Sequence, residues 1–387
     1  MKSGVKKFLI GLLILVVVSV IGILLLQKPN EPVVSPDRSV TTIVCATGGG
    51  KENFLADTEL NQILRDEYGI QVTHIPWSNG RINDQALADD SGNTYDAVFF
   101  SDQRFYEQYL AAVNKTYSRQ KGYIALNTPI VFYSWKPVVE VLTATGIVTE
   151  RDGVHYVSDM EKLLSYMDAG TRWSDIAPAD SLIRSNRNPI NVIGVDPVTS
   201  SPGATYMGLL AGILDPASRS GRVSDEALLR LQQVYRNSGF LGGTPADLFS
   251  QYLRIGAGTY PLIVDYEKSL IDWAVAHPEE YTKQIKDHAV LLYPEPTVWN
   301  SHCIISFSPE GSILVDALEN NERIHEIAFN KYGFRMGLAA KNVSSFQTAE
   351  GEITFDGIPS QLYATIPSLR MEGYNRIVEA LKKTITE

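Results

Sequence analysis

The loop Gly48–Lys51, with the sequence GGGK, carries residue types that could bind a phosphate or another anion. A nucleotide-binding loop of the form GxxxxGK[ST] would need glycine in place of Cys45 and serine or threonine in place of Glu52, so that class is excluded. What remains is a turn into a predicted helix start, where backbone N–H groups carry a partial positive charge and Lys51 adds a full one. The alternative is an ordinary tight turn with a surface lysine. The candidate ligand contacts of this loop are Gly49, Gly50 and Lys51.

A second candidate lies in the segment Asp196–Tyr206, which follows a predicted buried strand and enters a predicted helix. Ser200, Ser201 and the backbone of Gly203 fall at the helix start. Hydroxyl groups and free N–H groups at such a position suit an oxyanion or a carboxylate. An ordinary helix start with serine and proline is the alternative.

Three weaker candidates come from the ends of other predicted elements. Arg81, in the loop SNGR that also contains Ser78 and Asn79, offers a fork of donors that matches a bidentate anion. Thr244 precedes a proline and is the expected N-cap of a helix. Tyr266 ends a predicted strand, where strand carboxyl ends face a ligand crevice, although a tyrosine packed at a lobe boundary would read the same way.

The sequence gives no support for catalysis or for a metal site. His325 and Glu326 begin an HExxH pattern, but Phe329 stands where the second histidine is required. A GxSxG nucleophile elbow is absent, and Cys45 and Cys303 form no CxxC pair. We therefore expect no catalytic residue, no metal ligand and no cofactor.

The N-terminal stretch Phe8–Leu26 is an apolar run of about 19 residues, which as a helix spans roughly 28 Å and can cross a bilayer. Lysines at positions 2, 6 and 7 predict that the short N-terminal side stays in the cytoplasm. We expect residues 1–26 to form a single-pass anchor in the cell membrane, residues 27–39 a proline-containing linker, and the rest to fold outside the cytoplasm. A cleaved signal peptide and a buried core helix are the alternatives.

The composition limits the size of the folded part of the chain and the classes of partner that it can bind. The chain has 387 residues, of which 44% are hydrophobic, enough for two ordinary lobes. A formal net charge of -10 argues against a nucleic-acid partner, which needs a basic face, but leaves a local basic pocket open.

Short β-branched or aromatic runs alternate with amphipathic stretches, a pattern that is typical of an α/β fold with mainly parallel sheets. The run Tyr123–Trp135 is too long for one strand in a small lobe, so we expect it to cross from one lobe to another. The other predicted strands are 41–47, 70–77, 95–101, 189–195, 260–266, 289–294 and 302–307. The predicted helices include 103–111, 137–144, 159–167, 204–214, 225–236, 245–254, 311–319, 322–331 and 368–383.

Taken in order, several segments resemble the bacterial extracellular solute-binding proteins of the type 2 periplasmic-binding-protein architecture, in the branch of molybdate- and sulfate-type binders. They are TTIVCATGGGKENF, PWSNGRINDQ, YDAVFFSDQRFYEQYL, YIALNTPIVFYSWKP, IGVDPVTSSPGATYMGLL, YPLIVDYE, LLYPEP, HCIISF and KYGFR. The resemblance implies two α/β lobes joined by a hinge, with residues 40–130 plus about 260–387 in lobe 1 and about 131–259 in lobe 2. It places the ligand contacts on Gly49 to Lys51, Ser78 to Arg81, Ser200 to Gly203, the Thr244 region and Tyr266.

The function implied is that of a membrane-anchored extracytoplasmic protein that captures a small anionic ligand by hinge closure and presents it to a membrane transporter of the ABC type. The first loop has glycines and Lys51 where small-anion binders present serines, which favours a larger phosphorylated or carboxylated anion over molybdate or sulfate. Two alternatives remain open. One is a ligand-sensing or scaffold protein of an envelope complex with the same fold, and the other is an exported enzyme on a two-lobed scaffold.

Overall fold

The computed structural model describes residues 40–77, 95–113, 121–238, 243–337, 340, 343–349 and 351–386. The predicted membrane anchor and linker, and the candidate contacts Ser78, Asn79 and Arg81, lie outside these ranges. Within the described ranges, no helix combines the length and the apolar character needed to cross a bilayer.

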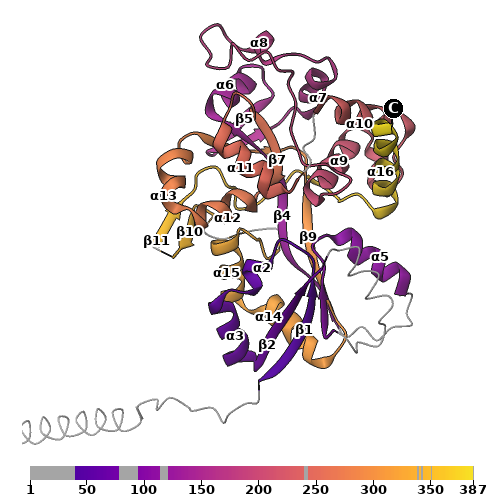
Figure 1. Cartoon of the computed structure of the whole chain (residues 1–387), viewed down its shortest axis with the longest axis vertical. Coiled ribbons are helices and arrows are strands. Elements are labelled where there is room, and N and C mark those ends of the chain that lie inside the picture. The colour runs from indigo at the N-terminus through magenta and orange to yellow at the C-terminus, as the bar shows by residue number, and fades with distance from the viewer. Residues whose placement is uncertain are drawn as a thin grey trace, which may run out of the picture. The chain divides into compact units, whose positions relative to one another are not determined.

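Ten strands form one mixed sheet (Figure 1). The expectation of mainly parallel sheets is wrong, because five of the strand pairs in this sheet are antiparallel and four are parallel. Its main path runs in the order β2 (Ile70–Pro76), β1 (Thr41–Thr47), β3 (Ala97–Phe99), β9 (Thr297–Ser306), β4 (Lys121–Trp135), β8 (Ala289–Pro294), β6 (Val154–Val157) and β5 (Val148–Arg151). Off this path, β7 (Leu262–Tyr266) pairs with β4 and β12 (Thr365–Ile366) pairs with β9. A separate hairpin joins β10 (Ser345–Thr348) and β11 (Gly351–Thr354).

Strand β4 belongs to two parts of the sheet. Its residues Lys121–Pro129 pair antiparallel with β9, and its residues Ile130–Trp135 pair with β7 and β8. Figure 1 shows β4 and β9 running together between the two groups of helices. The expectation that this long run crosses from one lobe to the other is therefore confirmed.

The first lobe is built on both faces of β1, whose side chains alternate in direction as strand geometry requires. Ile43 and Cys45 join a core with helices on one face, whereas Ala46 joins a smaller aromatic cluster on the other face. The helices that cover these faces are α2 (Glu52–Leu55), α3 (Thr58–Tyr68), α5 (Gln103–Val113), α14 (Pro309–Asn320) and α15 (Glu322–Tyr332).

The second lobe holds the largest core, which packs around the second half of β4. Its helices are α6 (Lys136–Ala144), α7 (Met160–Asp168), α8 (Trp173–Ile176), α9 (Ser201–Leu214), α10 (Asp225–Ser238), α11 (Pro245–Ile255), α12 (Lys268–Ala276), α13 (Pro278–Glu280) and α16 (Met371–Thr386). The C-terminal helix α16 packs against α10, and its Ile377 and Leu381 are buried in this core. The stretch 260–387 is thus distributed over both lobes, because α14 packs in the first lobe and α12 and α16 pack in the second.

Two local predictions differ from the structure. Residues 189–195, predicted as a strand, make only isolated bridges, in which Pro189 pairs with Arg172 and Ile193 pairs with Ile263. The hairpin of β5 and β6 was not predicted. Its two-residue turn is Asp152–Gly153, with φ values of 52° and 76°, which is the Asp-Gly signal of a tight hairpin.

Candidate functional site

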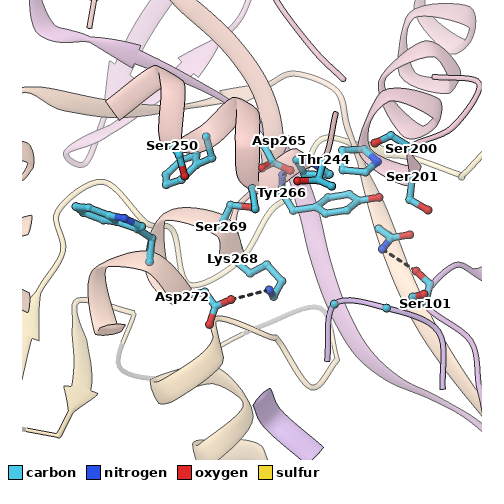
Figure 2. Close-up of a pocket in the computed structure, with 18 of the residues that line it drawn as sticks. Ser101, Ser200, Ser201, Thr244, Ser250, Asp265, Tyr266, Lys268, Ser269 and Asp272 are labelled. Atoms are coloured by element: carbon cyan, nitrogen blue, oxygen red, sulfur yellow. Dashed lines mark hydrogen bonds and ion pairs between the residues drawn. The ribbon is translucent and has the colours of Figure 1, made fainter. Parts of the chain in front are cut away.

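A cavity of about 690 Å³ is lined by residues of both lobes. The first lobe supplies the loop at Gly49 and Gly50, together with Ser101. The second lobe supplies residues 199–202, residues 243–246 and the first turns of α12. In Figure 2, Ser200, Ser201, Thr244 and Asp265 lie along the upper part of this cavity, with Lys268 and Asp272 below them.

The N-terminus of helix α9 lies at the cavity and has no side-chain cap from its N-cap residue. The N-cap residue Ser200 makes no side-chain capping hydrogen bond, and its Oγ is buried without a partner in the described structure. Ser200 and Ser201 both line the cavity. A buried hydroxyl without a partner is costly, so a ligand atom that accepts from Ser200 would relieve that cost.

Gly203, also a candidate contact, is the third residue of α9, and its role is in packing and not in contact with the cavity. It is buried and does not line the cavity. A Cβ at this position would stand 2.1 Å from the carbonyl oxygen of Val195, so only glycine lets the first turn of α9 pack on the preceding loop. Gly203 therefore positions Ser200 and Ser201.

Helix α11 also begins at the cavity, but its N-terminus is already neutralised. Thr244 and Asp247 form a capping box: the Thr244 hydroxyl donates to Asp247 Oδ2 at 2.7 Å, and the Asp247 N–H donates to Thr244 Oγ1 at 3.2 Å. The N–H and hydroxyl of Thr244 hold the pKa of Asp247 below its ordinary value, so this carboxylate is charged. Thr244 lines the cavity as predicted, but α9 is the better site for an anion.

Strand β7 and helix α12 bring one predicted contact, Tyr266, and several groups that were not predicted to the cavity. Tyr266, a predicted contact, lines the cavity, and its hydroxyl lies 3.3 Å from Thr205 Oγ1 on α9. Lys268 is 3.2 Å from Asp272 one helical turn later, a spacing that is visible in the sequence. The other lining residues that were not predicted include Asn53, Ser101, Phe249, Ser250, Asp265, Ser269, Trp273, Asn300 and His302.

His302 and Asn300 reach the cavity from β9, where alternate residues face the same side of the strand. The imidazole of His302 is 4% exposed, and its Nδ1 has no partner in the described structure. Burial, together with the nearby Lys51 and Lys268, holds the pKa of His302 well below its ordinary value. His302 is therefore neutral and presents an unpartnered ring nitrogen.

Lys51 is not placed in the cavity lining. Its side chain is 1% exposed, its Nζ donates to the Gly48 carbonyl at 2.7 Å, and it lies 4.8 Å from the centroid of the Phe99 ring. Burial lowers the pKa of Lys51 to about 7. Gly49 and Gly50 of the same loop do line the cavity, although the Gly50 N–H already donates to Glu52 at 2.8 Å.

Replacing Lys51 with methionine is expected to leave ligand affinity within about twofold, since the ammonium lies outside the cavity lining. The same change should alter the pH dependence of stability. Because the folded protein releases the Lys51 proton near pH 7 and the unfolded chain near 10.5, the wild type gains stability as the pH rises between these values. Urea unfolding at pH 7 and pH 9 should show a gain of about 2–3 kcal/mol that the variant lacks. Equal pH dependence in both proteins would contradict the burial of a neutral amine.

No protein-family model matches the chain. No curated protein matches its sequence either. Among solved structures, a periplasmic thiamin binding protein aligns over 89% of this chain and 96% of its own, with 9% identity and a TM-score of 0.54. The Trichodesmium protein IdiA (FutA), solved with iron and citrate ligands, aligns over 89% and 99%, with 11% identity and a TM-score of 0.55. A substrate binding protein of an ABC transporter from Agrobacterium tumefaciens aligns over 92% and 97%, with 13% identity and a TM-score of 0.52.

The chain has the two-lobed α/β fold of periplasmic solute-binding proteins. The alignments cover nearly the full length of these proteins, so the likeness extends to both lobes and to the strands between them. Identities this low establish the fold alone. The narrower likeness to molybdate- and sulfate-type binders stays a prediction.

Proposed function

We propose that this chain is a solute-binding protein that holds a small solute, through an oxyanion group, in the cavity between its lobes. The observation that carries the proposal is the start of α9, where the Ser200 hydroxyl is buried without a partner at the edge of the cavity. The helix dipole adds partial positive charge at this point. The capped N-terminus of α11 and the buried Lys51 contribute less, so we assign the anion subsite to Ser200 and Ser201.

The crossing strands support binding by closure. Of the described residues that line the cavity, some belong to the first lobe and others to the second, and β4 and β9 pass between these lobes. A small rotation about such strands changes the distance between Gly49 and Ser200 without breaking either core. Closure of this kind encloses a ligand without any covalent chemistry.

The size of the cavity argues for an organic solute. A volume of about 690 Å³ is in the range of pockets that bind drug-sized molecules. A tetrahedral inorganic oxyanion would fill only a small part of it. We therefore extend the proposal to a phosphorylated or carboxylated metabolite, delivered to a transporter of the ABC type, with residues 1–26 as the membrane anchor and the body outside the cytoplasm.

The test is a thermal-shift screen of residues 40–387 against phosphate, molybdate, citrate, thiamin, phosphorylated metabolites, amino acids and sugars, followed by calorimetric titration of each hit. A solute that binds only the folded state raises the melting temperature by mass action. If no class of solute shifts the melting temperature, the proposal fails, and a sensing or scaffold role in an envelope complex becomes the better account.

Replacing Ser200 with alanine should weaken binding of the identified solute roughly 10- to 100-fold, the effect of losing a hydrogen bond to a charged group. The melting temperature of the ligand-free variant should stay close to that of the wild type, because the Ser200 hydroxyl makes no hydrogen bond in the described structure. Ser220→Ala, at an exposed serine outside the cavity lining, is the matched control and should bind as the wild type does. Unchanged affinity in Ser200→Ala would remove the anion subsite from the start of α9.

A further inference from the structure

Asp265 is a buried acid that lines the cavity and has no ion-pair partner among the residues that the structure describes. It lies on β7, is 2% exposed and lines the cavity. Its carboxylate accepts the Tyr266 N–H at 2.8 Å and also interacts with the Ser269 side chain. These are neutral donors, and no ion pair of Asp265 occurs among the described residues. Lys268, a cation that lowers the pKa of Asp265, is paired with Asp272.

The other buried acids among the described residues, Asp102 and Glu267, each form an ion pair. Asp102 is paired with Arg104, and Glu267 is paired with Arg335 at 2.8 Å, and all four of these side chains are buried. Burying a carboxylate without a counter-charge is costly, and buried charges in proteins are normally paired. Among the described residues, Asp265 is therefore the buried acid that has no ion-pair partner, and it is the one of the three that lines the cavity.

The surroundings of Asp265 suit an organic cation. Phe249, Tyr266 and Trp273 line the same cavity, and aromatic rings attract ammonium groups. The Lys268–Asp272 pair contributes no net charge, so the charged side chains of the lining sum to about -1 through Asp265. His302 adds an unpartnered, neutral ring nitrogen in the same lining. This last group independently indicates that the cavity is built for a hydrogen-bonding ligand.

We propose that the solute is a zwitterion, with a cationic nitrogen against the Asp265 carboxylate and an oxyanion at Ser200 and Ser201 on α9. This inference rests on the proposed solute-binding function and narrows it to one class of ligand. The two subsites are of opposite charge and belong to different elements, so they fix the ligand's orientation as well as its composition.

The binding test uses pairs of solutes that differ by the nitrogen group: phosphoethanolamine and ethyl phosphate, glutamate and glutarate, carnitine and 3-hydroxybutyrate. We expect at least one zwitterion to bind the wild type tenfold or more tightly than its partner without nitrogen. Asp265→Asn keeps the shape and an acceptor for the Tyr266 N–H. It should weaken binding of that zwitterion roughly 10- to 100-fold while leaving the matched anion within about threefold. Asp168→Asn, at an ion-paired acid outside the cavity lining, is the matched control and should change zwitterion binding by less than about threefold.

The outcomes separate this inference from the function on which it rests. If the anions without nitrogen bind as tightly as the zwitterions, or if Asp265→Asn leaves zwitterion binding unchanged, the zwitterion inference is overturned and solute binding stands. If Asp168→Asn weakens zwitterion binding as much as Asp265→Asn does, the loss does not come from a charge in the cavity and the inference is overturned. If no solute of any class binds, the proposed function itself fails.

The ligand-free protein provides a second test that needs no ligand. Burial raises the pKa of Asp265 to about 6, so the folded protein loses stability from this group as the pH rises from about 4 to above 6. Above pH 6, Asp265→Asn should therefore melt roughly 3–6 °C higher than the wild type, and at pH 4 the two should melt alike. A variant that melts at or below the wild-type temperature at pH 7.5 would show that the charge is compensated within the protein, and would overturn the inference.

Discussion

Replacing Arg335 with alanine is expected to lower the free energy of unfolding by about 3–5 kcal/mol, because it leaves a buried carboxylate without its partner. Both side chains of the Arg335–Glu267 pair are fully buried, and two hydrogen bonds of 2.8 Å join them. Arg335 also donates to the carbonyls of Pro359 and Ser360, at 2.7 Å and 3.1 Å. The guanidinium thus ties the segment before β12 to the start of α12.

Urea unfolding measures this effect, with Arg323→Ala as the matched control. Arg323 pairs with Glu67, but these side chains are 58% and 43% exposed, so its loss should cost at most about 1 kcal/mol. The double change Glu267→Gln with Arg335→Met should recover part of the loss, since it leaves no unpaired charge. Equal effects of Arg335→Ala and Arg323→Ala would contradict the burial of the pair.

Gly203→Ala is expected both to destabilise the protein, by about 1–3 kcal/mol, and to weaken solute binding tenfold or more. The added Cβ would stand 2.1 Å from Val195 O and 2.9 Å from Pro197 N, and neither backbone atom can move without moving the loop before α9. That loop carries Ser200 and Ser201, so the cavity loses its shape where the anion subsite lies.

Gly311→Ala separates the two effects. A Cβ at Gly311, in α14, would also stand 2.1 Å from a backbone oxygen, that of Asp96, but this contact does not involve the cavity lining. The Gly311 variant should lose a similar amount of stability, measured by urea unfolding, while its folded fraction binds solute normally in calorimetric titration. Normal binding by a folded Gly203 variant would refute the positioning role of Gly203.

Much of the fold could be predicted from local signals in the sequence, such as the residues that begin and end helices. The helix end at Gly69, with φ of 67°, and that at Gly333, with φ of 66°, follow from the need for a left-handed residue after a helix. The start of α9 at Ser200 and Ser201 was likewise visible, since serine and proline favour helix N-termini. The crossing strand β4 followed from its length alone.

What the sequence could not supply depends on contacts between distant segments. Lys51 was a predicted ligand contact, with a surface lysine as the alternative, but its ammonium folds back to the Gly48 carbonyl and is buried over Phe99, a residue of another strand. Asp265 looked like an ordinary strand residue. Glu267, two residues later, is also buried, but Arg335, far along the chain, pairs with Glu267 and not with Asp265. Such differences arise in three dimensions and have no local pattern.

The shared strand β4 has a consequence for how this protein can come apart. Its first nine residues complete the hydrogen bonding of one lobe and its last six complete that of the other, without a break between them. Melting either lobe frees part of β4 and exposes the edge of the other lobe's sheet. The two lobes are therefore not independent folding units. If the chain were divided into one fragment for each lobe, only one fragment could contain β4, and the other lobe would lack the part of β4 with which its strands pair. Motion between the lobes must be a bend or twist of paired backbone, which limits how far the cavity can open.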